Sequence, residues 1–417
     1  MNYHDHHFHP MGYVSMVTGL ELMDTEDFDD LFRRVSEVRD ASDKGAIIGQ
    51  RLNDEGLTEH RFPDRHFLDE ISHDRPILLY RYCGHIGVAN SAALALAGVE
   101  TSTADPDGGR FDRDSTGSPN GVLRETALGV VSDALSPISP IPSRDETLAA
   151  LTGLTEVGIG SVTGMVSAGE PMWCGVGREL DAILDLAPDL PIDIGLIVIT
   201  EDPAELAGAA AAIRSTEGRV SFVGWKDFSD GSLGGHTAAM YEPFADEPDE
   251  IGTLRLRPEK AAMMARTSLA LGGAVAIHAI GDRANDEVLD LFEVLLGEGA
   301  HPASLRLEHA SLVTDKALAR MQRMGITVSV QPAFLASEGD WLEKRLGAAR
   351  MRLAYRFRSM VEAGLTVLGG SDCPVEPPDP AIGIAAATNR HGINTDEELT
   401  ASQSEALFTP PGIRGIT

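Results

Sequence analysis

The stretch YHDHHFHP occupies residues 3–10, close to the start of the chain. In an extended strand successive side chains alternate between the two faces, so His7 and His9 point the same way. Two imidazoles that are two residues apart can bind one divalent metal ion. A histidine-rich terminus can also be a tag remnant or an ordinary solvated end, and the run alone does not separate these readings. The remaining ligands have to be sought downstream.

Apolar runs alternate with helix-length segments through most of the chain. The seven runs that follow residue 145 are Ser161–Met165, Ile192–Thr200, Ser221–Phe228, Ala274–Ile280, Leu305–Ala310, Ile326–Gln331 and Leu365–Gly370. The histidine-bearing start of the chain adds an eighth run. Strands that alternate with helices predict parallel pairing, and eight such units predict an α/β fold, the (β/α)8 TIM barrel. The alternative is a doubly wound open sheet, but no GxGxxG or phosphate loop follows the first strand.

Candidate ligands lie at or near the ends of these runs. A barrel carries its reactive groups at the carboxyl ends of its strands. A single strand histidine is more often a hydrogen-bonded core residue than a ligand. Several histidines that converge at the carboxyl end of one barrel predict a metal site. The residues of this predicted site are His7, His9, Lys226, His278, His309 and Asp372.

Asp372 lies in the turn GGSDCP, residues 369–374. A carboxylate on such a turn, facing a cationic pocket, is placed to accept a proton from metal-bound water. Asp372 is therefore the predicted catalytic base, and Glu308 is the next candidate.

Composition excludes several classes of function. The chain has 417 residues, of which 43% are hydrophobic and 24% charged, as in soluble globular proteins. The formal charge of −30 argues against nucleic acid or an anionic membrane as partner. Without a bilayer-length apolar run or a secretory signal, the sequence predicts a cytoplasmic protein. The predicted partner is a small-molecule substrate, and a homodimer is left open.

Three cysteines, Cys83, Cys174 and Cys373, are widely spaced and contain no CxxC pair. They predict neither a disulfide framework nor a zinc ribbon, and free thiols fit a reducing compartment.

The block from about residue 40 to 142 departs from the regular alternation. It holds apolar runs at 46–49 and 75–82 and a helical segment at 91–97, and a Gly-, Asp- and Pro-rich stretch at 101–120 predicts a surface loop. A helix is expected before it, at 25–39. We therefore expect an insertion between the first two barrel strands, with a small sheet of its own.

The ligand set resembles that of the amidohydrolase superfamily. Three motifs, WKDFSDGSLG (225–234), HAIGDRA (278–284) and GSDCPVEP (370–377), resemble its amidohydrolase 3 or YtcJ-like branch, which includes N-substituted formamide deformylases. The motifs CGH (83–85) and GVLRE (121–125) are also similar to that branch. The resemblance spans nearly the whole chain.

This resemblance implies a hydrolase that acts on carbon–nitrogen bonds other than peptide bonds, of the amide or formamide type. One or two divalent ions, zinc foremost, would lower the pKa of bound water from 15.7 to about 7. A cyclic-amidine deaminase and a lactone hydrolase are alternatives on the same site. An inactive fragment that only binds ligands is a third.

Lys226 differs from the other predicted ligands because its side chain is normally positively charged. An ammonium group that points at a divalent metal is repelled, so the resemblance implies carboxylation of Lys226 to a carbamate that bridges two ions. In the single-metal alternative Lys226 stays protonated and points away. Lys226 could also be an ordinary strand-end lysine that reaches solvent or pairs with Asp227 or Asp230.

Four further residues are predicted to bind substrate: His85, Glu125, Asp230 and His236. His85 and Glu125 could equally be a buried structural pair. His236 stands where members of the branch commonly have arginine, which implies a different specificity. Members also carry a β-sandwich subdomain built from both ends of the chain, and we expect most of it to be missing here.

Overall fold

The computed structural model describes residues 2–169 and 178–410. The chain divides into two compact units. The first contains the amino-terminal residues up to Pro10, Leu151–Ala168 and the chain from Leu180 onwards, and the second contains Met11–Ala150. Within the described ranges, no helix combines the length and the apolar character needed to cross a bilayer.

The first unit is built on eight parallel strands. In their spatial order they are β1 (Tyr3–Phe8), β8 (Ile159–Ser167), β9 (Asp193–Ile199), β10 (Val220–Phe228), β11 (Ala274–Ala279), β12 (Leu305–His309), β13 (Thr327–Val330) and β14 (Thr366–Gly369). Phe8 forms a parallel bridge with Cys373, and the Asp372 N–H donates to the His7 carbonyl at 2.8 Å. These contacts join the first strand to the segment after the last, and the predicted (β/α)8 barrel is confirmed.

The strands lie close to the predicted runs because parallel barrel strands are buried on both faces and are therefore nearly continuously apolar. Strand β12 departs from this pattern. All five of its residues are buried although three of them, Arg306, Glu308 and His309, are polar or charged. A buried charge has to be paired, so this strand brings polar chemistry into the barrel.

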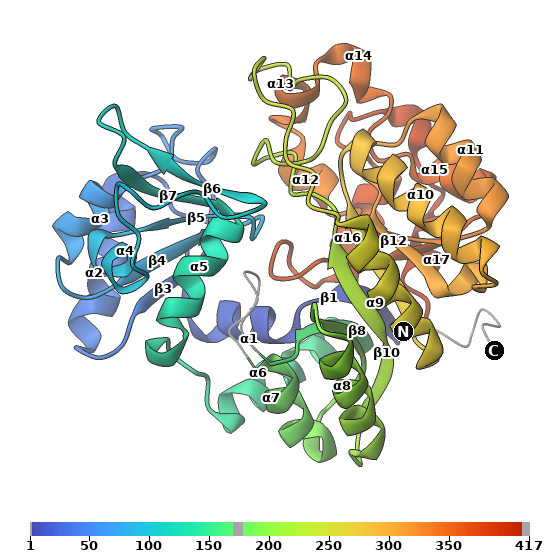
Figure 1. The fold of residues 1–417 in the computed structure, drawn as a ribbon, viewed down its shortest axis with the longest axis horizontal. Helices are drawn as coiled ribbons and strands as arrows, with labels where there is room; N and C mark the ends of the chain where they lie inside the picture. The colour runs from blue at the N-terminus through green and yellow to red at the C-terminus, as the bar shows by residue number, and fades with distance from the viewer. Residues whose placement is uncertain (1, 170–177, 411–417) are drawn as a thin grey trace. The chain divides into compact units, whose positions relative to one another are not determined.

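Helices follow the barrel strands (Figure 1). Two of them, α8 (Pro203–Ser215) and α9 (Pro258–Ala270), contact β10, and α9 and α10 (Asp282–Gly297) contact β11. The helices of this unit are α7 (Glu179–Leu186), α8 (Pro203–Ser215), α9 (Pro258–Ala270), α10 (Asp282–Gly297), α11 (Asp315–Met324), α12 (Phe334–Glu338), α13 (Leu342–Leu346), α14 (Ala348–Met351), α15 (Phe357–Glu362), α16 (Pro380–Thr388) and α17 (Ala401–Leu407).

The second unit has a mixed six-stranded sheet. Its order is β2 (Leu20–Glu21), β3 (Ile47–Leu52), β4 (Ile77–Arg81), β5 (Ile86–Ala89), β7 (Pro119–Glu125) and β6 (Gly109–Arg113). The first three strands are parallel and the remaining pairs are antiparallel.

Two separate hydrophobic clusters cover the two faces of this sheet. On β4, Leu79 belongs to the cluster that includes α2 (Phe28–Ala41) and α3 (Arg65–Ile71), whereas Leu78 belongs to the cluster that includes α4 (Ser91–Leu96) and α5 (Thr126–Leu135). The alternation of neighbouring side chains thus gives three layers. The remaining helices, α1 (Pro10–Thr18) and α6 (Arg144–Glu156), contain two of the positions at which the chain passes from one unit to the other.

The structure differs from the sequence prediction at two places in this unit. The predicted loop 101–120 contains strand β6, which pairs with β7 although its sequence GRFDR is largely polar. An edge strand tolerates such polar residues because one side of its backbone is left without a neighbouring strand. The unit also reaches back to Met11, ahead of the expected start near residue 40.

Candidate metal centre

Strand β1 separates its histidines by face. His4 lies 2.7 Å from the Ser161 hydroxyl and 2.9 Å from the Thr163 hydroxyl, and so packs against β8. Burial lowers the pKa of His4 to about 3. His7, three residues on, points to the opposite face, where Glu308 is its neighbour. The two-residue alternation therefore keeps His4 out of the candidate site.

Three predicted ligands converge. Nitrogen atoms of His7 and His309 and a carboxylate oxygen of Asp372 lie within 4.8 Å of one another, and all three residues are buried. Asp372 Oδ1 lies 3.3 Å from His7 Nε2 and 3.1 Å from His9 Nε2. Imidazole nitrogens and a carboxylate in one buried group suit a zinc-like divalent ion, so the residues present fit the implied metal.

Two of these ligands have an unusual backbone conformation. His309 has a φ of 72° and Asp372 a φ of 56°, in the left-handed region that non-glycine residues rarely adopt. The Asp372 N–H donates to the His7 carbonyl, which holds the turn in this conformation. Such strain is concentrated at functional sites, where the surroundings enforce it.

Lys226 lies within the same group. Its side chain is 1% exposed, and its Nζ lies 3.5 Å from His7 Nε2 and 4.9 Å from the centre of the Phe228 ring. The lysine nitrogen therefore points towards His7 rather than to solvent.

His278 is nearby but does not join the converging atoms. Its ring centre lies 4.4 Å from that of His309. Its Nε2, however, lies 3.0 Å from the Gly231 carbonyl oxygen and 3.3 Å from an oxygen of Asp230. An ion would have to be bound through the other ring nitrogen of His278.

Asp230, predicted to bind substrate, is engaged by the backbone. Its carboxylate is fully buried and accepts hydrogen bonds from the N–H groups of Ala239, Ile280 and Gly281 at 2.8–3.0 Å. The side chain thereby ties the loop after β10 to the turn after β11, and this turn begins two residues beyond His278.

Glu308 fixes the orientation of His7. Its carboxylate lies 2.6 Å from His7 Nδ1 and also pairs with Arg306. Burial raises the pKa of Glu308, but Arg306 and His7 outweigh this and leave the pKa well below its usual range. The ionised carboxylate places the proton on Nδ1 and leaves the Nε2 lone pair for a metal. This contact was not predicted, since Glu308 figured only as an alternative base.

Gln331 has the same relation to His309. Its Oε1 lies 2.7 Å from His309 Nδ1, and the ring of Phe334 stacks on the imidazole at an interplanar angle of 13°. The sequence analysis missed Gln331. Its position at the end of the predicted run Ile326–Gln331 was the signal that could have found it.

Asp5 joins the first strand to the last. Its carboxylate accepts hydrogen bonds from the Ser371 hydroxyl at 2.6 Å, the Ser371 N–H and the His7 N–H. Burial raises the pKa of Asp5 to about 6. Asp5 thus aligns the backbone on either side of the candidate ligands without being one of the converging atoms.

His236 lies in the first unit, on the loop after β10. Its Nε2 is 3.1 Å from a carboxylate oxygen of Asp246, and its ring stands edge-on to Phe244. Arg345 binds the same carboxylate. Burial and then Arg345 lower the pKa of His236, and Asp246 opposes this shift.

His85 and Glu125 form a buried pair in the second unit, with His85 Nδ1 3.0 Å from a Glu125 carboxylate oxygen. Of the cysteines, Cys83 and Cys373 are thiols, and Cys174 lies outside the described residues.

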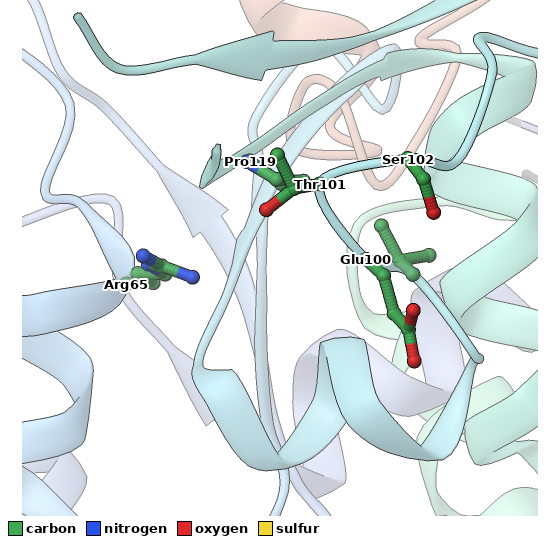
Figure 2. Close-up of a pocket in the computed structure, with 6 residues that line it drawn as sticks. Arg65, Glu100, Thr101, Ser102 and Pro119 are labelled. Atoms are coloured by element: carbon green, nitrogen blue, oxygen red, sulfur yellow. The ribbon is translucent and has the colours of Figure 1, made fainter. Parts of the chain in front are cut away.

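A cavity of about 560 Å³ opens on the second unit, lined by Arg65, Val99, Glu100, Thr101, Ser102 and Pro119. Figure 2 shows Arg65 on one side of it and Glu100 and Ser102 on the other. Among the described residues that line this cavity there is no histidine, no cysteine and none of the predicted site residues. The candidate chemistry therefore lies elsewhere, in the barrel.

Comparison with known proteins finds relatives that match most of the chain. The chain is 31% identical over 411 residues to a Bacillus subtilis protein named YtcJ, covering 97% of this chain and 75% of that protein. It is 27% identical over 380 residues to the N-substituted formamide deformylase of Arthrobacter pascens, covering 87% and 68%.

A solved structure from Pyrococcus horikoshii, described as an uncharacterized metal-dependent hydrolase, superposes with a TM-score of 0.73 at 27% identity, covering 97% of this chain and 80% of that one. Residues 4–411 match the model of the amidohydrolase family, a range that includes every candidate ligand. With this match over nearly its whole length, the chain belongs to the amidohydrolase family.

Proposed function

We propose that this protein is a metal-dependent hydrolase that cleaves a carbon–nitrogen bond of the amide or formamide type. The observation that carries the proposal is the convergence of His7, His309 and Asp372 on one buried point at the carboxyl ends of the barrel strands. The similarity to a formamide deformylase and to a metal-dependent hydrolase supports it.

The residues that would hold the metal are His7, His9, His309 and Asp372. His278 lies next to His309, and Lys226 lies next to His7. When bound, a divalent ion lowers the pKa of water and polarises the carbonyl group of a substrate. Zinc is the ion that we propose, because imidazole and carboxylate ligands suit it. Carboxylation of Lys226 would turn a repelled ammonium into two oxygen ligands and allow a second ion.

Asp372 is the residue that we propose to move protons. Burial raises its pKa, but His7 and His9 outweigh this and hold it at about 2, so the carboxylate is ionised at neutral pH. An ionised carboxylate can accept a proton during attack on the carbonyl and return it to the departing nitrogen. Glu308 and Gln331 orient the histidine rings throughout.

His85, Glu125, Asp230 and His236 remain proposals for substrate contacts. Asp230 would act mainly by holding the loops around His278, because three backbone N–H groups occupy its oxygens.

The test combines metal analysis with a substrate panel. Protein purified from cells that were grown with added zinc is expected to hold one or two ions per chain. It is also expected to hydrolyse N-formyl amines or small amides. Cyclic amidines and lactones in the same panel distinguish the alternative hydrolases. Metal-loaded protein that turns over none of these compounds would contradict the proposal and favour a binding protein.

A further inference from the structure

The cavity on the second unit is built from three separate parts of that unit. Arg65 is the first residue of α3, Pro119 is the first residue of β7, and residues 99–102 follow α4. Its volume of about 560 Å³ is in the range of small-molecule binding sites, about 300–1,000 Å³. Pro119 and Glu125 are the two ends of β7, so Pro119 lies at the end of this strand away from the buried pair of His85 and Glu125.

The wall that carries Arg65 is fixed by the packing of α3 against β7. The Asp64 carboxylate accepts a hydrogen bond from the Phe67 N–H at 3.0 Å and caps the helix. Gly121 on β7 has a φ of 101°, and a Cβ at this position would lie 2.9 Å from the backbone nitrogen and the Cβ of Arg65. A glycine is needed for such a close approach. The backbone of Arg65 is therefore held beside β7.

The Arg65 side chain contains a buried donor. Its Nε has no acceptor among residues 2–169 and 178–410. The Asp114 carboxylate accepts hydrogen bonds from the Thr116 hydroxyl and from the N–H groups of Thr116 and Ser118. These bonds lower the pKa of Asp114 first, and the charge of Arg65 contributes last. A buried donor without an acceptor is unfavourable, so the guanidinium is suited to bind an acceptor from outside the chain.

The opposite wall consists of the exposed residues Glu100, Thr101 and Ser102. Arg113 Nη1 donates to the Thr101 carbonyl at 3.1 Å, and the Glu100 N–H donates to the Thr103 hydroxyl oxygen at 2.8 Å. These contacts hold the wall in place. Figure 2 shows Glu100 across the cavity from Arg65, so the two residues place opposite charges on opposite sides.

We propose that this cavity binds a small zwitterion of the amino-acid type, with its carboxylate on Arg65, its ammonium group on Glu100 and its apolar part on Val99 and Pro119. A guanidinium matches a carboxylate because it can donate two parallel hydrogen bonds. Val99 and Pro119 are buried apolar residues of the lining. The formal charge of −30 repels a simple anion, whereas a zwitterion carries no net charge. The proposal does not depend on the hydrolase activity, because all lining residues belong to the second unit.

Leucine and two compounds that each lack one of its charges test the proposal. Isopentylamine lacks the carboxylate, 4-methylpentanoate lacks the ammonium group, and none of the three has a bond that an amide hydrolase could cleave. Isothermal titration calorimetry of the full-length protein should show that leucine binds roughly 10-fold or more tightly than either single-charge compound, the effect of one charged hydrogen bond. Equal affinities for all three compounds would overturn the proposal.

Two substitutions assign each charge of leucine to a residue. Arg65→Gln should weaken leucine binding by roughly 10-fold or more and leave isopentylamine binding unchanged, because that compound has no carboxylate. Glu100→Gln should weaken leucine binding and leave 4-methylpentanoate binding unchanged. Arg110→Gln is the matched control, since the side chain of Arg110 is 51% exposed on β6 and does not line the cavity.

The outcomes also distinguish this cavity from the metal centre, where an amino acid could bind through its carboxylate. Leucine binding that persists in His309→Ala and is weakened in Arg65→Gln would support the cavity. Leucine binding that is lost in His309→Ala and unchanged in Arg65→Gln would place the ligand at the metal centre and overturn the proposal. Wild-type protein that binds no leucine at millimolar concentrations would overturn it as well, and would leave the proposed hydrolase untouched.

Discussion

The Glu308 carboxylate and the His7 imidazole form a buried pair, with 2.6 Å between Oε2 and Nδ1 and neither side chain more than 1% exposed. Through this pair the sixth strand of the barrel determines which nitrogen of a first-strand histidine faces the candidate site. The pair joins residues that are 301 positions apart in the chain.

Glu308→Gln should weaken metal binding by about 10- to 100-fold, because the amide keeps an acceptor but loses the charge that makes His7 a better ligand. Competition with a chelator measures the affinity. Glu362→Gln, on an exposed helical residue, is the control. Equal affinity in Glu308→Gln and wild type would mean that this pair only stabilises the fold.

His309→Ala should lower the metal content more than His278→Ala does. His309 belongs to the converging group, whereas one ring nitrogen of His278 is engaged by the Gly231 carbonyl. Elemental analysis of both variants, purified in parallel, measures the difference. The reverse order would place His278 in the primary ligand set.

Asp372→Asn should keep most of its metal through the histidines and lose roughly 10²-fold or more in rate, as expected for removal of a positioned base. Single-turnover rates at saturating metal measure the effect, and Asp396→Asn at an exposed position is the control. Near-normal turnover would assign the base to another group, with Glu308 next in line.

Activity should depend on bicarbonate if Lys226 is carboxylated. Protein kept in buffer depleted of carbon dioxide should lose activity and recover it when bicarbonate is added. Lys226→Ala should be inactive and partly rescued by small carboxylates that replace the carbamate oxygens. Full activity without carbon dioxide would support a single ion beside an unmodified amine.

His4 should make the fold sensitive to mild acid. Burial lowers its pKa from 6.5 to about 3, so between these values the unfolded chain binds one more proton than the folded chain. The free energy of unfolding should therefore fall as the pH drops below about 6.5.

Between about pH 7.5 and 5, the free energy of unfolding should decrease by about 1–2 kcal/mol less in His4→Gln than in wild type. Urea denaturation at a series of pH values measures this difference. His66→Gln, at an exposed position, should follow the wild-type curve. Parallel curves for His4→Gln and wild type would show that other groups cause the acid sensitivity.

Much of the barrel could be predicted from local patterns. Most residues of the parallel barrel strands are buried, so their apolar runs are visible in the sequence, and β11 and β12 end within one residue of their predicted limits. Strand β6 could not be found in this way, because an edge strand needs no apolar run and pairs only once β7 is beside it.

The sequence by itself determined the barrel and the identity of the polar residues at its strand ends. It also indicated that His7 and His9 point the same way, because the alternation of an extended segment is local, although β1 itself ends at Phe8. Only the tertiary structure decided which of these groups meet: strand closure brings Asp372 against His7, and barrel curvature brings Glu308 and Gln331 behind the two histidines. It also turns one nitrogen of His278 towards a backbone carbonyl. These contacts join residues from distant parts of the chain, and their distances depend on how all eight strands pack together, which no local pattern records.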